Sequence, residues 1–403
     1  MHTYAFFTNN SVQNSTQKKV NMFDFDKQIN RRNTNSLKWD VAPDELPLWV
    51  ADMDFPTAPA VVKAVTERAA SGVYGYNIVP EQWNEAICNW WQQRHNHTIS
   101  ADSLIFATGV VPIISSVVRK LTTPAEKVLV LSPVYNIFFN SIETTGRIPL
   151  ECKLVFDGTK YDIDFADLSS KLADKQTSLM LLCNPHNPGG IVWTKEQLAE
   201  IGKLAYENGV VVLSDEIHCD LTDPDVEYTP FASVNDTCKY NSVTCISATK
   251  AFNIAGLQCA ACYADNPVIR HKVWRALNTD EVAEPNCFAI QATIAAFTQG
   301  APWLDELRQY VYKNKQYVST FLQQNIPQIK VVDGSATYLM WLYVGEITDN
   351  SAALCKQIRD KTGLYLSDGV QFRGDGNLFV RINVACPRAT LAEAMRRLQK
   401  ALS

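Results

Sequence analysis

The chain has 403 residues, of which 46% are hydrophobic, and this length suits a large core divided between two domains. A net charge of −5, with lysines and arginines scattered in twos and threes, argues against a protein that binds nucleic acid. No apolar run approaches the length of a membrane span, and eleven cysteines without a regular spacing predict a cytoplasmic protein with reduced thiols.

The first segment, residues 1–21, is polar and lacks the apolar stretch and cleavage site of a secretion signal, so we expect a flexible N-terminal extension. Further along, short apolar runs end in turn or polar residues and predict strands: LIFATG, KVLVLSP, SLMLLCNP, GVVVLSDE and SVTCIS. Amphipathic stretches lie between them. In one of these, Thr194 and Gln197 form a capping-box pattern and Gly209 marks the end of the helix.

Strands that are buried on both faces and joined by helices indicate an α/β fold with a mostly parallel central sheet flanked by helices. From about residue 300 the pattern changes to a long helix, the run ATYLMWLYV, a second helix and the run NLFVRINVACP. This order predicts a smaller α+β domain.

Two pairs of residues that are close in the sequence are expected to be structural: Cys259 and Cys262 in a buried strand, and His95 and His97 at a helix end. We predict no metal site.

Ligands of open α/β sheets bind beyond the carboxyl ends of the strands, so the residues after each apolar run are candidates. Val110 and Val111 open a helix whose free N–H groups suit a phosphate, although a plain strand–helix turn explains them equally well. The turn over residues 184–190 contains two Asn-Pro pairs, which make it stiff. Its amides serve either a ligand or the turn itself.

Two charged residues follow later strands. Asp215 would be costly at the end of a buried strand unless it meets a cation, but it can also cap the next element. Lys250 lies close to the hydroxyls of Ser247 and Thr249, although a lone lysine commonly holds its ammonium in water. Taken together, these groups suit pyridoxal phosphate, because a lysine forms a Schiff base with its aldehyde and a carboxylate keeps its ring nitrogen protonated.

The segments NPHNPGG, SDEIH, SATKAFNIAGLQ and RINVACPR, in this order, resemble fold type I pyridoxal-phosphate enzymes of the aspartate aminotransferase superfamily. They are most similar to cystathionine β-lyases of the MalY/PatB type, and LPLWVADMDFPTAPAV, GVYGYN and SPVYNIFF fit the same group. The resemblance implies the fold type I architecture. It places residues 22–60 in the N-terminal part of a small domain, 61–290 in a large cofactor-binding domain and 291–403 in the C-terminal part of the small domain.

The resemblance also implies roles for single residues. Lys250 would bond the cofactor and move the proton at Cα, Asp215 would pair with the ring nitrogen, and Asn187 would bond the ring hydroxyl oxygen. Arg381 would bind the substrate carboxylate. The other cofactor contacts would be Tyr135, stacked on the ring, and the phosphate-binding residues Val110, Val111, Ser247, Thr249 and Tyr76, the last from the partner of a homodimer with shared active sites. Either tyrosine could instead pack in the core.

The activity that the resemblance implies is a carbon–sulfur β-lyase reaction. Cystathionine, or a related cysteine S-conjugate, would give a thiol such as homocysteine, with pyruvate and ammonia, as methionine biosynthesis requires. His218 and Gln258 stand where many aminotransferases have Tyr and Arg, which favours the lyase over a class I/II aminotransferase. A non-catalytic protein that binds pyridoxal phosphate is a further alternative. The residues do not identify the preferred sulfur amino acid.

Overall fold

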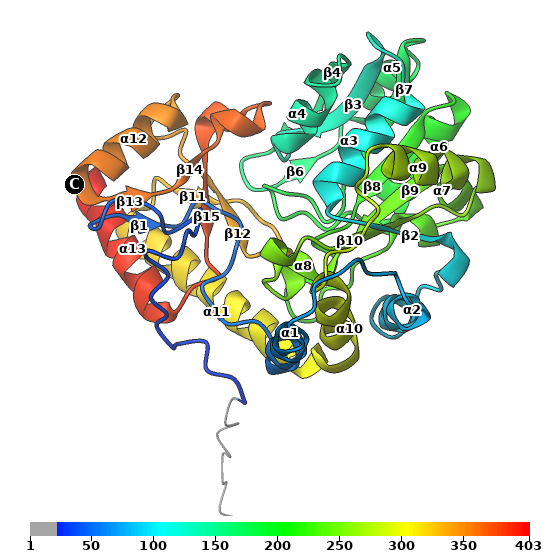
Figure 1. Ribbon diagram of the computed structural model, residues 1–403. Helices are drawn as coiled ribbons and strands as arrows, with labels where there is room; N and C mark the ends of the chain where they lie inside the picture. Colours follow the sequence, from blue (N-terminus) through cyan, green and yellow to red (C-terminus); the bar gives the residue numbers. More distant parts are fainter. Residues whose placement is uncertain (1–21) are drawn as a thin grey trace, which may run out of the picture.

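The computed structural model describes residues 22–403, and the extension predicted over residues 1–21 lies outside the described residues. Figure 1 shows two lobes, the larger of which is built on a seven-stranded sheet in the order β2-β10-β9-β8-β7-β3-β4. Its strands are Leu104–Ala107 (β2), Lys127–Ser132 (β3), Ile148–Lys153 (β4), Thr177–Cys183 (β7), Val211–Asp215 (β8), Ser242–Ile246 (β9) and Ala260–Tyr263 (β10).

This sheet is mostly parallel, as predicted. The strands from β4 to β9 run parallel to their neighbours, whereas β10 is antiparallel to both β2 and β9. The five apolar runs expected to be strands form β2, β3, β7, β8 and β9. Cys262 lies within β10 and Cys259 directly before it, and both are buried, so the Cys-x-x-Cys sequence belongs to a buried strand as expected.

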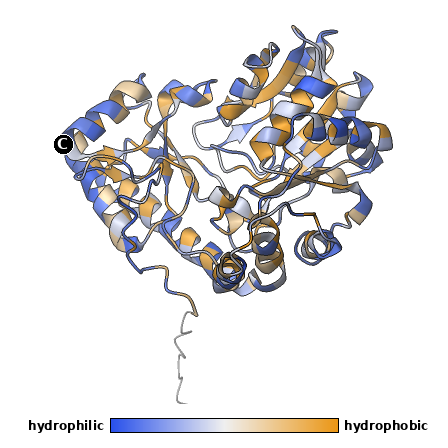
Figure 2. Ribbon diagram, in the orientation of Figure 1, coloured by the Kyte–Doolittle hydropathy of each residue, from blue (hydrophilic) through white to orange (hydrophobic). Residues whose placement is uncertain are grey.

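Helices cover both faces of the large sheet (Figure 1). In β7, Leu179 and Leu181 pack into one apolar cluster with α3, while Met180 and Leu182 pack into another with α6. Figure 2 shows the same division as apolar colour on the sheet and on the inner helix faces. The helices of this lobe are Pro59–Ala70 (α1), Glu81–His95 (α2), Val110–Leu121 (α3), Ile137–Glu143 (α4), Phe165–Leu172 (α5), Lys195–Glu207 (α6), Asp236–Tyr240 (α7), Ala248–Ala251 (α8), Pro267–Thr279 (α9) and Ala289–Gln299 (α10).

Two details of the predicted helices are confirmed. The hydroxyl of Thr194 accepts a hydrogen bond from the backbone nitrogen of Gln197 at 3.2 Å, and the reciprocal bond completes the capping box of α6. Helix α2 ends at His95. His97, which follows it, is buried against the hydroxyl of Tyr263, so the two histidines face different surroundings.

The smaller lobe contains an antiparallel sheet in the order β11-β12-β15-β14. Its elements are Lys330–Val331 (β11), Leu339–Tyr343 (β12), Ser367–Asp368 (β14), Phe379–Asn383 (β15), Ala301–Asn325 (α11), Ser351–Thr362 (α12) and Arg388–Leu402 (α13). Leu46–Pro47 (β1) pairs with Leu364–Tyr365 (β13), so the early segment lies against the C-terminal one. Val155–Phe156 (β5) and Tyr161–Asp162 (β6) form a separate pair. The domain boundaries themselves stay predictions.

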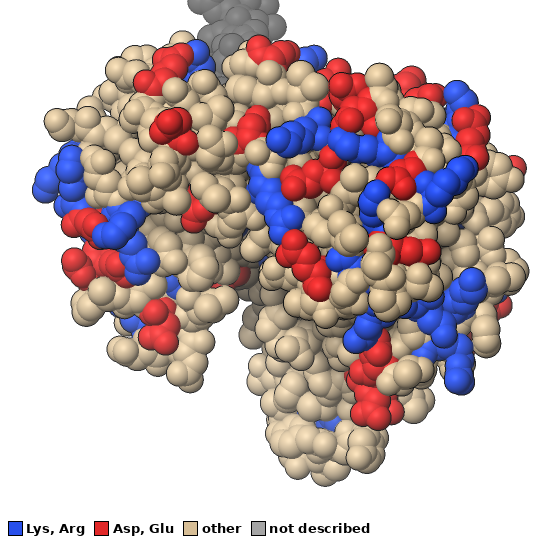
Figure 3. Space-filling view, turned by 90° about the horizontal axis from the view of Figure 1, so that it is seen from above, with Lys and Arg blue, Asp and Glu red and all other residues tan. Residues whose placement is uncertain are grey.

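The surface and the thiols add two observations. Over the face seen in Figure 3, basic and acidic side chains are interspersed and form no continuous basic surface. All eleven cysteines are free thiols, and all but Cys88 and Cys287 are buried.

Among the described residues, no helix combines the length and apolar character that crossing a bilayer requires.

Candidate active site

A cavity of about 320 Å³ lies beyond the carboxyl ends of β7, β8 and β9, where a ligand of an open α/β sheet is expected. Seven of the predicted site residues line it: Val110, Val111, Tyr135, Asn187, Asp215, Thr249 and Lys250. Its other walls come from Ala51, Thr108, Gly109, Pro112, Cys183, Ile217, His218, Ala255 and Gln258. The structure therefore brings together residues that are up to about 200 positions apart in the sequence.

Lys250 lies in the short helix α8, directly beyond β9. Its ammonium donates a hydrogen bond to the backbone carbonyl of Ala51 at 2.7 Å. Burial lowers the pKa of Lys250 from 10.5 to about 8, and the positive charge of Arg381 acts in the same direction. The carboxylates of Asp52 and Asp215 oppose this shift. The neutral form of this amine is therefore more accessible than in an ordinary lysine, as a nucleophile or proton acceptor requires.

Asp215 is the last residue of β8 and is 3% exposed. Its carboxylate accepts a hydrogen bond from the backbone nitrogen of Ile217 at 3.2 Å, and burial raises its pKa from 3.8 to about 7. No lysine or arginine of residues 22–403 forms an ion pair with it. A buried carboxylate that lacks a cation and faces a cavity suits a positively charged group on a ligand.

Arg381 lies on β15 of the smaller lobe and is buried. Its Nη1 donates to Asn187 Oδ1 at 3.2 Å, and its Nη2 donates to the carbonyl of Trp49 at 3.0 Å and to Ser367 Oγ at 3.4 Å. Its Nε has no partner, and no carboxylate in the described part of the chain forms an ion pair with it. Burial lowers its pKa to about 10. Arg381 does not itself line the cavity, but Asn187, to which it donates, does. A buried, unpaired guanidinium next to the cavity suits a ligand carboxylate.

The predicted phosphate-binding residues separate into two groups. Val110 and Val111 begin α3, whose first turn has no side-chain cap, and they line the cavity together with Thr249. Ser247 is already engaged, because its hydroxyl donates to the carbonyl of Cys259 at 2.7 Å and caps α8. Ser247 does not line this cavity. Its contact with a phosphate stays a prediction.

The two predicted tyrosines also differ. Tyr135 lines the cavity, and its backbone nitrogen donates to the carbonyl of Asn187 at 3.1 Å. Tyr76 lies outside this chain's cavity and is fully exposed, so it is not a core aromatic. Its neighbours Val73, Tyr74 and Ile78 are 70%, 58% and 80% exposed. A role for Tyr76 in a partner's site stays a prediction.

The sequence did not reveal one part of the site, the carbonyl of Ala51. Besides the bond from Lys250, this oxygen accepts one from the hydroxyl of Tyr338 at 2.9 Å. The only available signal was the segment LPLWVADMDFPTAPAV, which contains Ala51 and resembles the lyase family. The residue type at a position does not show whether its backbone carbonyl takes part in a site. His218 and Gln258, which the sequence did not place among the site residues, also line the cavity. Burial and the charge of Lys250 lower the pKa of His218 to about 3, so this imidazole is neutral.

Comparisons with known proteins identify the family. Residues 43–398 match the family described as aminotransferase class I and II. The cystathionine beta-lyase PatB of Bacillus subtilis (strain 168) is 39% identical over 385 residues, covering 94% of this chain and 100% of that protein. Protein MalY of Escherichia coli (strain K12) is 31% identical over 389 residues, covering 94% and 99%.

A solved structure extends the likeness to three dimensions. Cystalysin from Treponema denticola, whose crystal structure contains a pyridoxal 5'-phosphate cofactor, aligns with a TM-score of 0.92 at 31% identity. The alignment covers 94% of this chain and 99% of cystalysin. Fold and sequence thus agree with the resemblance found in the motifs, and the chain belongs to the aminotransferase class I and II family.

Proposed function

We propose that the protein is a pyridoxal-phosphate-dependent carbon–sulfur β-lyase. Its substrate would be cystathionine or a related cysteine S-conjugate, and its products a thiol, pyruvate and ammonia. The observation that carries the proposal is a set of three buried charges, none of which has an ion-pair partner among the described residues. Lys250 and Asp215 line the cavity, and Arg381 donates to Asn187, which also lines it. The relative named cystathionine beta-lyase, which aligns with nearly the whole chain, supports the lyase assignment.

The donor set fits pyridoxal phosphate group by group. The carboxylate of Asp215 suits a protonated ring nitrogen, and the amide of Asn187 suits the ring hydroxyl oxygen. The start of α3 suits the phosphate, because it has no side-chain cap and its residues Val110 and Val111 line the cavity. Lys250, with its lowered pKa, suits the aldehyde.

When bound, pyridoxal phosphate supplies an aldehyde that condenses with amines and a protonated ring that accepts electrons from Cα. The chain's own residues supply the rest. Arg381 holds the substrate carboxylate, which fixes the orientation of Cα. Lys250, as the neutral amine, removes the Cα proton, and Asp215 keeps the proton on the ring nitrogen. The thiolate then leaves from Cβ, and hydrolysis of the remaining three-carbon fragment gives pyruvate and ammonia.

Three finer statements belong to the same proposal. The protein acts as a homodimer in which Tyr76 of each subunit completes the partner's site, since the exposed apolar segment around Tyr76 would otherwise face water. It works in the cytoplasm, where its eleven thiols stay reduced. Cleavage of cystathionine to homocysteine would serve methionine biosynthesis.

A product assay tests the reaction. Cystathionine alone should give pyruvate and free thiol, without any added 2-oxo acid. A thiolate leaves readily from a carbon next to a carbanion, so the reaction needs no acceptor for the amino group. A second mixture contains alanine or aspartate with 2-oxoglutarate, and a Lys250→Ala variant is the control for both. Rapid glutamate formation in the second mixture, with no pyruvate in the first, would assign the chain to the aminotransferases instead.

A further inference from the structure

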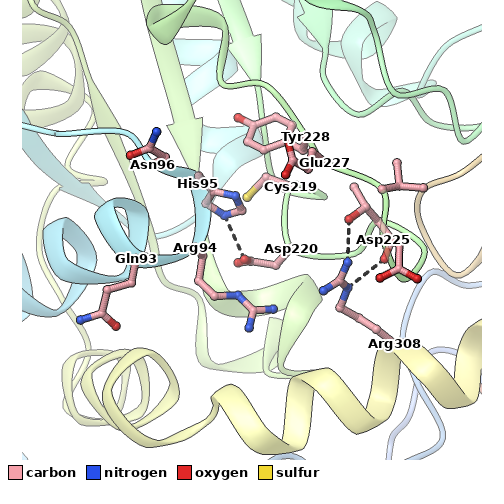
Figure 4. Close-up of a pocket in the computed structure, with 12 residues that line it drawn as sticks. Gln93, Arg94, His95, Asn96, Cys219, Asp220, Asp225, Glu227, Tyr228 and Arg308 are labelled. Carbon is pink, nitrogen blue, oxygen red and sulfur yellow. Dashed lines mark hydrogen bonds and ion pairs between the residues drawn. The ribbon is translucent and has the colours of Figure 1, made fainter.

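A second and larger cavity, of about 710 Å³, lies apart from the candidate active site. Figure 4 shows it between the end of α2, the segment that follows β8 and the helix α11. Three side chains of metal-binding type meet in its wall: His95, Cys219 and Asp220. Their potential ligand atoms, one nitrogen, one sulfur and one oxygen, all lie within 4.8 Å of one another.

The surrounding contacts hold these side chains in place. His95 Nε2 lies 3.0 Å from Asp220 Oδ1, and the indole nitrogen of Trp90 donates to both oxygens of that carboxylate at 3.0 and 3.1 Å. Cys219 and Asp220 are 2% and 4% exposed. Trp90 thus orients the carboxylate of Asp220 without itself binding an ion. Metal ligands in proteins are commonly held in this way by a hydrogen bond from a neighbouring residue.

The charges around the cavity favour a cation. Its two arginines face the same acid, since Arg94 Nη1 lies 2.8 Å and Arg308 Nη1 3.9 Å from Asp305 Oδ1. Asp225 and Glu227 also line the cavity, are exposed and form no ion pair within residues 22–403. Asp225 and Glu227 are therefore carboxylates on the cavity wall that no arginine pairs with directly.

We propose that His95, Cys219 and Asp220 bind a zinc ion whose fourth ligand is a water molecule from the cavity. A nitrogen, a thiolate and a carboxylate oxygen form a donor set that zinc accepts, whereas magnesium and calcium prefer oxygen alone. Tetrahedral bonds of about 2.0–2.3 Å place ligand atoms roughly 3.3–3.7 Å apart, so no pair of these atoms lies more than about 1.5 Å beyond that spacing. The ion would join the end of α2 to the segment that begins at Asp215.

Binding replaces the thiol proton of Cys219 by zinc and releases that proton to water, and His95 binds the ion through a ring nitrogen that carries no proton.

Metal titration of the intact holoenzyme, stripped with a chelator and kept free of substrate, tests the proposal. One equivalent of Co²⁺ should give the visible bands of a tetrahedral site, at longer wavelengths than the cofactor absorbs, and Zn²⁺ should displace it. Cys219→Ser and His95→Gln should each weaken Zn²⁺ binding by at least about 10²-fold. Cys287→Ser, which changes a half-buried thiol that does not line this cavity, is the matched control and should bind as the wild type does.

Thermal unfolding gives a second measurement that does not depend on the spectrum. Zn²⁺ should raise the Tm of the wild type and of Cys287→Ser but not that of Cys219→Ala. Absorption of the bound cofactor reports that each variant is folded. An absent cobalt spectrum, or an identical one in Cys219→Ser, would overturn the zinc site.

Discussion

The guanidinium of Arg381 and the side-chain amide of Asn187 are joined across the two lobes by a hydrogen bond of 3.2 Å from Nη1 to Oδ1. This contact orients the amide so that its nitrogen remains available to another acceptor. The unpartnered Nε of Arg381 leaves the guanidinium with a donor for a carboxylate. The residue proposed to bind the substrate carboxylate, Arg381, and the residue proposed to bind the ring hydroxyl oxygen, Asn187, are therefore hydrogen-bonded to each other.

Replacing Arg381 by alanine should weaken amino-acid binding far more than cofactor binding. Loss of a charge-assisted pair of about 2–3 kcal/mol predicts a rise in KM of roughly 10²-fold. Arg381→Lys should recover only part of this loss, since a lysine lacks the planar fork. Spectral titration with substrate measures the first effect, and titration of the apoenzyme with pyridoxal phosphate measures the second. An unchanged KM would give Arg381 a purely structural role.

The lowered pKa of Lys250 predicts how cofactor uptake depends on pH. Only the neutral amine attacks an aldehyde, so the rate of uptake by the apoenzyme should rise with pH and level off above about 8, instead of above the ordinary 10.5. Because the charge of Arg381 helps to lower this pKa, Arg381→Gln should move the midpoint to higher pH. Stopped-flow absorption follows the reaction. A wild-type midpoint near the ordinary lysine value would contradict the burial argument.

Asp215→Asn should stabilise the apoenzyme at pH 8 while lowering kcat by roughly 10²-fold or more. The folded-state pKa of Asp215 is raised from 3.8 to about 7, so the folded apoenzyme loses stability as pH rises between these values. Asparagine avoids this cost, which amounts to at most about 4 kcal/mol. The gain should shrink steadily toward pH 4, because Asp215 is then protonated in the folded state and the pH approaches its unfolded-state pKa of 3.8. Thermal unfolding of both apoproteins from pH 4 to 8 tests this, and a gain independent of pH would refute it.

Sequence patterns revealed the parts of the site that carry a residue-type signal. Asp215 and Lys250 stand out because each is a charge that follows a buried apolar run. The direction of β10 was hidden, since small apolar residues such as Ala260 and Ala261 suit a parallel or an antiparallel strand equally well. The engagement of Ser247 was hidden too, because a hydroxyl before a helix can either cap it or bind a ligand.

Contacts between residues far apart in the sequence were also not predicted. His95 was judged against its sequence neighbour His97, but its contact is Asp220, which lies 125 positions away. Similarly, Lys250 donates to the carbonyl of Ala51, 199 positions earlier. Only the folded chain brings such groups together. The family resemblance indicated that the segment around Ala51 mattered, but could not indicate which atom did.

Tyr76 provides the test of shared sites. It is fully exposed and outside the cavity of its own chain, so a contribution to catalysis requires a second subunit. Tyr76→Ala and Lys250→Ala should each be inactive as pure dimers. In a hybrid dimer with shared sites, one site carries both changes and the other carries neither. Random exchange makes half of the dimers hybrid, so about a quarter of the wild-type activity should return. The two variants mixed without exchange of subunits are the control. If the wild type is an active monomer, or if exchange restores nothing, Tyr76 has no role in a partner's site.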